Sequence, residues 1–288
     1  MVTRTAVNPR GTRRTFVRVG ILGIAGCAAR MGDVDPRPRG GGLIRVMSLN
    51  LAHGRGRALV QTRARPADWY RRNLDAIASV IEREAPDVVA LQEAELGSRW
   101  SGGFDHVEHV ARECGLAVLA TTAFVHVPGR YEYGTAIIGS AEVTASGGGA
   151  FAVHGRWRKG FTAASLRIDE IALDIVSLHL DHASAAIRSQ QANEIVQALG
   201  ARSGPLVVLG DFNDGWHANS PARQLTESLG LVANSPLARG PATFAFGRRL
   251  DWILASRDFD IVAHHVLVDD RLSDHRAVLA DLRPARTR

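Results

Sequence analysis

The chain has 288 residues, 45% of them hydrophobic, which is enough apolar material for a buried core. The formal charge is +6 at pH 7, but residues 1–26 carry five arginines and no acidic residue, so residues 27–288 hold 30 basic and 29 acidic groups. This balance gives no global electrostatic attraction to nucleic acid, and the composition excludes collagen-like and coiled-coil repeats.

The N-terminal segment has the order of an export signal. Arg13 and Arg14 precede a weakly apolar run, Val19 to Gly26, which ends at Cys27. This order resembles a twin-arginine signal, and Ile24-Ala25-Gly26-Cys27 resembles a bacterial lipobox. The run of about eight residues is too short to cross a bilayer.

We therefore expect residues 1–26 to be the export signal, residues 27–42 a tether lipidated at Cys27, and residues 43–288 one folded domain. Membrane attachment through Cys27 would place the protein at the bacterial cell surface or on the periplasmic side. An Arg-rich leader with a chance cysteine is the alternative. A monomer is favoured.

Short apolar runs alternate with amphipathic segments from residue 43 onward. Strands are expected at Leu43 to Asn50, Asp87 to Leu91, Ala117 to Thr121, Gly134 to Gly139, Thr162 to Ile168, Ile171 to His179, Leu206 to Gly210, Leu250 to Ala255, Ile261 to Leu267 and Ala277 to Leu282. Helices are expected at Asp68 to Ala85, His106 to Gly115, Ser184 to Leu199 and, more weakly, after Ser220. This pattern predicts an α/β (α+β) fold of two packed mixed sheets flanked by helices.

Polar side chains able to bind metal recur where apolar strands end. Asn50, Glu93, His179 and Asp211 each follow or close such a run. Each one alone has an ordinary explanation, such as a turn or a cap. Four at equivalent positions, joined by Asp251 and Ser273-Asp274-His275 beside two further strands, favour one shared catalytic rim.

At this point the chain resembles the endonuclease/exonuclease/phosphatase superfamily. The motifs that carry the resemblance are Ser48-Leu49-Asn50, Leu91-Gln92-Glu93, Ser177-Leu178-His179, Gly210-Asp211-Phe212-Asn213, Leu250-Asp251-Trp252-Ile253 and Ser273-Asp274-His275. The resemblance implies a four-layer sandwich like that of DNase I, with the active site at one rim. It also implies hydrolysis of phosphate esters with a divalent metal.

The chemistry of these residues suits that reaction. Glu93 and Asn50 offer the oxygen ligands that Mg2+ prefers, with Mn2+ or Ca2+ as alternatives. Asp211 is the candidate for orienting or deprotonating the attacking water, and Asn213 for holding the water or a phosphate oxygen. His179 and His275 are expected to donate hydrogen bonds to the phosphate. The resemblance implies that Asp251 pairs with His275.

Two points stay open at the metal. Asp274 suits either a metal ligand or a residue that steers the water. Some family nucleases place a second carboxylate two residues after the asparagine, but here that position is Ala52, followed by His53. This departure predicts a metal site with fewer carboxylates than in those nucleases, and so a different metal affinity and metal choice.

Substrate contacts are expected from Tyr133, Lys159 and Arg249. Ordinary strand packing is the favoured explanation for Tyr133, and solvated loop charges explain Lys159 and Arg249 equally well. The metal motif of metallo-β-lactamase-like hydrolases is incomplete, because Ser177 occupies the position of its first histidine. The Asp-x-His and Gly-Asn-His motifs of calcineurin-like hydrolases are not present. A lipid or small phosphodiester is the favoured substrate. The alternative is that the enzyme is an endo- or exonuclease acting on DNA or RNA. A surface-anchored binding protein without turnover is the alternative of another class.

Overall fold

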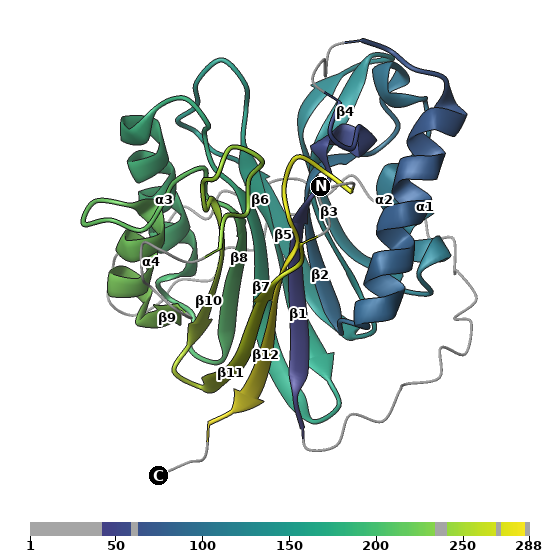
Figure 1. The fold of residues 1–288 in the computed structure, drawn as a ribbon. Coiled ribbons are helices and arrows are strands. Elements are labelled where there is room, and N and C mark those ends of the chain that lie inside the picture. The colour runs from purple at the N-terminus through teal and green to yellow at the C-terminus, as the bar shows by residue number, and fades with distance from the viewer. Residues whose placement is uncertain (1–41, 59–62, 234–240, 269–271, 286–288) are drawn as a thin grey trace, which may run out of the picture. The chain divides into compact units, whose positions relative to one another are not determined.

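Two mixed sheets of six strands each pack face to face in the computed structural model, which describes residues 42–58, 63–233, 241–268 and 272–285 (Figure 1). The first sheet has the order β11 (Phe259–Val266), β12 (Val278–Pro284), β1 (Ile44–Asn50), β2 (Val88–Glu95), β4 (Tyr131–Gly139), β3 (Ala117–Val127). The second has the order β5 (Glu142–Ala150), β6 (Gly160–Ile168), β7 (Ile171–His179), β8 (Leu206–Asp211), β10 (Asp251–Ser256), β9 (Leu231–Ala233).

Helices cover the outer face of each sheet and complete the four-layer sandwich, which confirms the expected fold class. The helices α1 (Ala67–Glu84) and α2 (His106–Glu113) lie on the first sheet, and α3 (Ala185–Leu199) and α4 (Pro221–Leu229) lie on the second (Figure 1). The side chains of Ser184 and Ser220 cap α3 and α4 by accepting hydrogen bonds from backbone N–H groups of the first turn.

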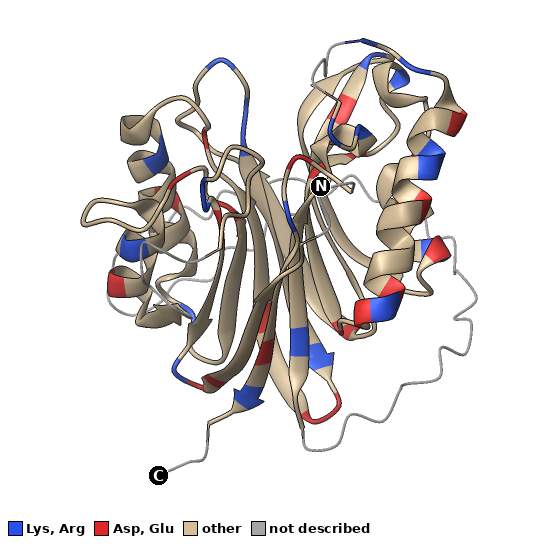
Figure 2. Ribbon diagram, viewed as in Figure 1, with Lys and Arg blue, Asp and Glu red and all other residues tan. Residues whose placement is uncertain are grey.

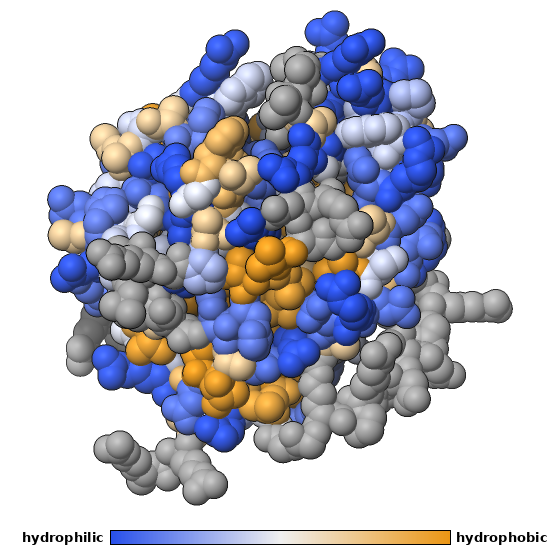
Figure 3. Space-filling model, viewed as in Figure 1, coloured by the Kyte–Doolittle hydropathy of each residue, from blue (hydrophilic) through white to orange (hydrophobic). Residues whose placement is uncertain are grey.

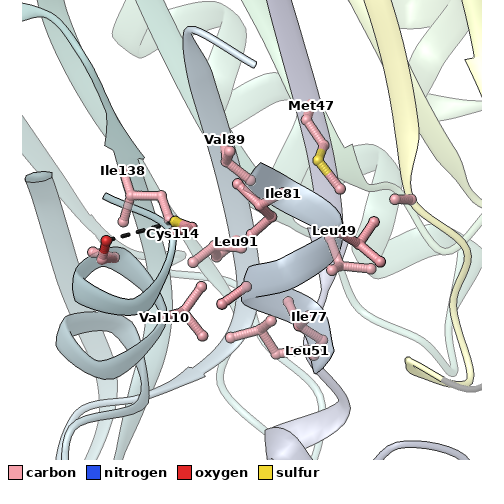
Figure 4. Close-up of a cluster of buried hydrophobic side chains, with 14 of the residues drawn as sticks. Met47, Leu49, Leu51, Ile77, Ile81, Val89, Leu91, Val110, Cys114 and Ile138 are labelled. Atoms are coloured by element: carbon pink, nitrogen blue, oxygen red, sulfur yellow. Dashed lines mark hydrogen bonds between the residues drawn. The ribbon is translucent and has the colours of Figure 1, made fainter. Parts of the chain in front are cut away.

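Three apolar cores hold the layers together. One lies between the first sheet and its helices, one between the two sheets, and one between the second sheet and α3 and α4. In the first core, Leu74, Ile77 and Ile81 of α1 pack against β1 and β2. Cys114 packs there beside Ile138 as a buried small apolar residue, and its thiol donates to the carbonyl of Ala111 (Figure 4).

Each sheet has a parallel pair at its centre. The strands β1 and β2 are parallel and joined through α1, and β7 and β8 are parallel and joined through α3. Asn50 pairs with Gln92 at one carboxyl end, and His179 pairs with Asp211 at the other. The parallel arrangement therefore delivers Asn50, His179 and Asp211, three of the expected site residues, to strand ends.

Strands lie at all ten expected positions, and the prediction missed β5 and β9. The strand β5 is exposed along most of its length and contains Gly147, Gly148 and Gly149, so it has no apolar run. It forms an edge of the second sheet, where backbone pairing with β6 holds it. The strand β9 has three residues and forms the other edge, too short for a periodic pattern to be seen.

The described surface is mixed in charge and hydropathy. Basic and acidic residues are interspersed over both halves of the fold (Figure 2). On the face in view, apolar side chains gather in patches among hydrophilic ones (Figure 3). None of the helices in the described ranges is long and apolar enough to cross a membrane.

Candidate active site

Strand ends of the two sheets meet at one rim of the sandwich. The amide nitrogen of Asn50, at the end of β1, donates to Oδ2 of Asp211, at the end of β8, over 3.1 Å. Ser273 ties the segment before β12 to the same place, since its hydroxyl donates to the backbone oxygen of Asn50 over 2.7 Å. The convergence expected from sequence is therefore seen for residues that lie more than 200 positions apart in the chain.

Below the rim, a buried polar network joins the sheets. The amide of Gln92 in β2 donates to the hydroxyl of Ser177 in β7 over 3.1 Å, and that hydroxyl lies 3.2 Å from the carbonyl of Leu91. Buried polar groups of this kind are satisfied only when the two sheets sit in one register. The network therefore aligns the strand ends above it.

The backbone at Asp211 is shaped by a glycine and a turn. Gly210 has φ of +148°, and a Cβ there would lie 2.0 Å from the carbonyl oxygen of Leu178, so only glycine fits against β7. Beyond it, the backbone N–H of Asn213 donates to Oδ1 of Asp211, and the Asn213 amide donates to the carbonyl of Leu180. Oδ2 of Asp211 is thus the oxygen that faces the site.

Oδ2 of Asp211 lies between two histidines. Nε2 of His179 is 3.4 Å away and Nε2 of His275 is 3.7 Å away. Burial raises the pKa of Asp211 to about 6, with His275 lowering it and Asp251 raising it. This carboxyl group is consequently a stronger base than an exposed aspartate.

Asp251 and His275 form the expected pair. Oδ2 of Asp251 lies 2.9 Å from Nδ1 of His275, and both side chains are buried. Burial by itself lowers the pKa of His275, but the charges of Asp251 and then Asp211 outweigh it and raise the value to about 10. His275 is therefore a cationic hydrogen-bond donor near neutral pH.

Lys159, the only lysine of the chain, projects into the same cluster. Its ammonium group lies 2.8 Å from Nε2 of His179 and 3.6 Å from Oε1 of Glu93. Burial and then this ammonium hold the pKa of His179 well below its ordinary value. His179 is thus neutral and takes the opposite protonation state from His275.

The other expected residues are distributed around this cluster. Glu93 occupies a β-bulge of β2 with φ of +49°, which aims its side chain away from the regular ladder. Tyr133 borders the site through its edge-on contact with His53, and burial raises the pKa of its phenol.

Burial also raises the pKa of Asp274, which precedes His275. Arg249 stacks 4.0 Å over Trp252, and its role in substrate binding stays a prediction.

Two carboxyl groups and one imidazole of the rim lie close enough together to contact one cation. Ligand atoms of Asp211, Asp251 and His275 lie within 4.8 Å of one another. Oδ1 of Asp251 is buried and has no hydrogen-bond partner among the described residues. His275 opposes metal binding at that group, because a protonated imidazole has no lone pair to give. The assignment of Glu93, Asn50 and Asp274 as metal ligands stays a prediction.

Sequence reasoning missed a second group beside Glu93. His53 lies between Glu93 and Glu95, and Trp100 donates to Glu95 over 3.1 Å. A signal was present, because Glu95 stands two residues after Glu93 and His53 three residues after Asn50. The expected lipidation site, Cys27, and the export signal lie outside the described residues.

Comparison with known proteins agrees with the fold and with the motif order. A model of the Endonuclease/Exonuclease/phosphatase family matches residues 47–275. No curated protein sequence matches the chain.

Solved structures of low sequence identity share the fold. An endonuclease/exonuclease/phosphatase from Beutenbergia cavernae is 23% identical, with a TM-score of 0.64 over 85% of this chain and 72% of that one. The human nocturnin catalytic domain, solved with a bound sulfate anion, is 19% identical, with a TM-score of 0.63 over 84% and 95%. A mannosyl-6-phosphatase from Bacteroides thetaiotaomicron is 17% identical, with a TM-score of 0.60 over 83% and 99%.

Members of this family are generally hydrolases such as phosphatases and nucleases, and they commonly use a divalent metal. The match over residues 47–275, the two-sheet sandwich and the shared rim of strand ends agree. The chain belongs to the Endonuclease/Exonuclease/phosphatase family.

Proposed function

We propose that the chain is a divalent-metal-dependent phosphoesterase that directs water at the phosphorus in line with the leaving oxygen. The observation that carries the proposal is the contact set around Oδ2 of Asp211. A buried carboxylate with a raised pKa meets one neutral and one cationic imidazole there, and Asn50 of the other sheet donates to it. A base beside a cationic donor suits phosphate hydrolysis, because the base takes the proton of the water and the donor stabilises charge on the phosphate oxygens.

Asp211 acts on the water. Its Oδ1 is held by the backbone of Asn213, which leaves Oδ2 to accept a proton from the nucleophile. A pKa of about 6 keeps Asp211 ionised near neutral pH while making it a better proton acceptor than an ordinary aspartate.

His275 and Lys159 act on the phosphate. The Asp251 carboxylate holds His275 by Nδ1, so the Nε2 proton is the one that reaches a non-bridging oxygen. The buried ammonium of Lys159 gives a second positive charge beside Glu93. Both groups stabilise negative charge that gathers on the phosphate oxygens.

The metal fits at Glu93, with Asn50 and Asp274 as further candidates. A divalent cation there would neutralise the phosphate charge and polarise the leaving oxygen. Carboxylate and amide oxygens suit Mg2+ and Mn2+.

A phosphodiester that is small or part of a lipid is the proposed substrate class. The near-balanced charge of residues 27–288 gives no strong attraction to a polyanion. Trp157, two residues before Lys159, is 49% exposed, and Phe246, in the loop whose Phe244 packs on His275, is 77% exposed. Exposed aromatic rings near a phosphate site suit a substrate with an apolar part.

Export and lipid anchoring at Cys27 belong to the proposal as well. They rest on the order of the leader residues and on the lipobox-like Ile24-Ala25-Gly26-Cys27. An anchored enzyme meets lipid headgroups and small extracytoplasmic esters more readily than chromosomal DNA.

Replacing the proposed base, Asp211, or the proposed cationic donor, His275, tests the proposed function. Asp211→Asn and His275→Gln should each lower turnover of a model phosphodiester by about 100-fold or more, because a positioned base supplies about two to four orders of magnitude and a positioned donor to the developing charge about two to three. The assay measures metal-dependent release of the leaving group, with excess EDTA abolishing it.

Exposed residues of the same types provide the controls. Asp260→Asn on β11 and His126→Gln on β3 should leave turnover unchanged. Near wild-type turnover by Asp211→Asn would contradict the assignment, and a wild-type protein inactive on all phosphate esters would favour the binding-protein alternative. A panel of lipid headgroup esters, soluble diesters and plasmid DNA separates phosphodiesterase from nuclease.

A further inference from the structure

His53 stands between two carboxylates. Its Nδ1 lies 2.6 Å from Oε1 of Glu95, and its Nε2 lies 3.4 Å from Oε2 of Glu93. The imidazole itself is buried. Since an ionised carboxylate only accepts hydrogen bonds, the short contact assigns the Nδ1 proton to the bond with Glu95.

The longer contact is the informative one. A separation of 3.4 Å exceeds the usual range of an N–H···O bond, about 2.7–3.2 Å. Metal–ligand bonds of about 2.1 Å place neighbouring ligand atoms about 3.0–3.4 Å apart in octahedral or tetrahedral geometry. Nε2 of His53 and Oε2 of Glu93 are spaced as two ligands of one ion.

The partner of the imidazole is rigid. Glu95 is fully buried and also accepts a hydrogen bond from the indole N–H of Trp100. The rings of Trp100 and Tyr133 contact the imidazole edge-on at 5.1 and 4.8 Å between centroids. A carboxylate that holds one nitrogen of a histidine while the other faces a metal is a recurrent arrangement in metal sites.

The backbone conformation also supports His53 and Glu93 as ligands of one ion. Ala52 and His53 have φ of +46° and +53°, a left-handed conformation that is costly for residues with a Cβ. It is held by Asn50, whose side-chain oxygen accepts from the Ala52 N–H. The turn brings His53 to Glu93 although Ala52 itself supplies no ligand.

The two oxygens of Glu93 face different groups. Oε1 lies 3.6 Å from the Lys159 ammonium, and Oε2 faces His53. The side chain is 18% exposed, so water can complete a coordination sphere on the open side. A cation is repelled from the Lys159 side and accommodated on the His53 side.

We propose that Nε2 of His53 is a ligand of the divalent cation at Oε2 of Glu93, with Glu95 as the positioning residue of the imidazole. The inference rests on the proposed metal dependence and goes beyond it by naming the metal class. A nitrogen ligand favours Mn2+, Co2+ or Zn2+ over Mg2+ and Ca2+, which prefer all-oxygen sites.

Metal binding without substrate tests the inference. We expect Mn2+ to bind at least about tenfold more tightly than Mg2+ in calorimetric titrations, and bound Mn2+ to show 14N modulation from a coordinated imidazole in electron spin-echo spectra. His53→Asn, whose asparagine tolerates the left-handed backbone, should remove the 14N signal and lower Mn2+ affinity more than Mg2+ affinity. Glu95→Gln should lower Mn2+ affinity about 10- to 100-fold while the fold stays intact.

Control variants make the outcome decisive. His126→Asn, on the exposed face of β3, should change neither affinity nor signal. A 14N signal absent from wild type, or retained in His53→Asn, would overturn the inference. If His53→Asn does not fold, unchanged Mn2+ affinity in Glu95→Gln overturns it. The binding measurements use no substrate and are therefore independent of catalysis. A wild-type protein that binds Mn2+ through His53 but hydrolyses no phosphate ester would count against the proposed function and leave this inference standing.

Discussion

His179 and His275 lie on two sides of one carboxylate, and their surroundings give them opposite charges. Burial and the Lys159 ammonium keep His179 neutral, whereas Asp251 and Asp211 keep His275 protonated against the cost of burial. Two histidines of the same site thus have different protonation states and different roles. The difference comes from neighbours that lie far away in sequence.

Asp251→Asn should separate the charge of this pair from its geometry. Without the Asp251 charge, the pKa of His275 falls from about 10, by about one unit or more. The donor form is present below that pKa and is lost as pH rises through it. The alkaline limb of kcat/KM should therefore move to lower pH, as measured between pH 5 and pH 11 at saturating metal. A profile that superimposes on wild type, as expected for Asp260→Asn, would argue against His275 as the donor.

At the scale of elements, left-handed backbone gathers where the strands end. Six residues other than glycine have positive φ in the described ranges, and four of them, Ala52, His53, Glu93 and Asn213, belong to the site or its turns. Such conformations cost free energy and persist where packing enforces them. The segment Ala52–Gly54 is enforced by His106 of α2, whose ring closes over Gly54.

Gly54→Ala should disturb this segment more than a matched glycine elsewhere. A Cβ at Gly54 would lie 2.8 Å from the His106 ring, whereas one at Gly103, which has a similar φ of +73°, meets nothing within 4 Å. Both variants bear the left-handed cost, and only Gly54→Ala adds overpacking, about 1–3 kcal/mol. Urea denaturation should show this difference between the two. Equal losses of stability in Gly54→Ala and Gly103→Ala would mean that α2 shifts to make room and does not fix the conformation of Ala52–Gly54.

At the scale of the whole described fold, two halves of similar plan are joined at the rim. Each contributes a parallel pair, and bonds such as Gln92 to Ser177 and Asn50 to Asp211 cross from one sheet to the other. A ligand at the rim therefore stabilises the sheets together.

Calorimetric melting should report this coupling. A cation at 100 times its Kd stabilises the folded state by about 2.7 kcal/mol, which corresponds to a rise in Tm of about 5–10 °C for a domain of this size. The rise should appear in a single transition and should vanish in Glu93→Gln. A wild-type Tm that does not respond to Mg2+ or Mn2+ would remove the metal from the proposed site.

Local patterns in the sequence were enough to predict most elements and the residue types of the site. Apolar runs predicted ten strands because burial imposes a local period, and the stripe of α1 predicted its helix for the same reason. The motifs at Asn50, Glu93, His179, Asp211 and His275 predicted one family and one rim. The edge strand β5 escaped because its glycines and exposed face carry no such period.

Only the tertiary structure decided how those parts meet. Strand order, the contact of Lys159 with His179 and Glu93, and the place of His53 between Glu93 and Glu95 all depend on pairings between distant segments. Periodicity records whether a side chain is buried and says nothing of which neighbour it is buried against. The charge state and ligand set of the site follow from those neighbours, so they appear only when the two sheets are brought together.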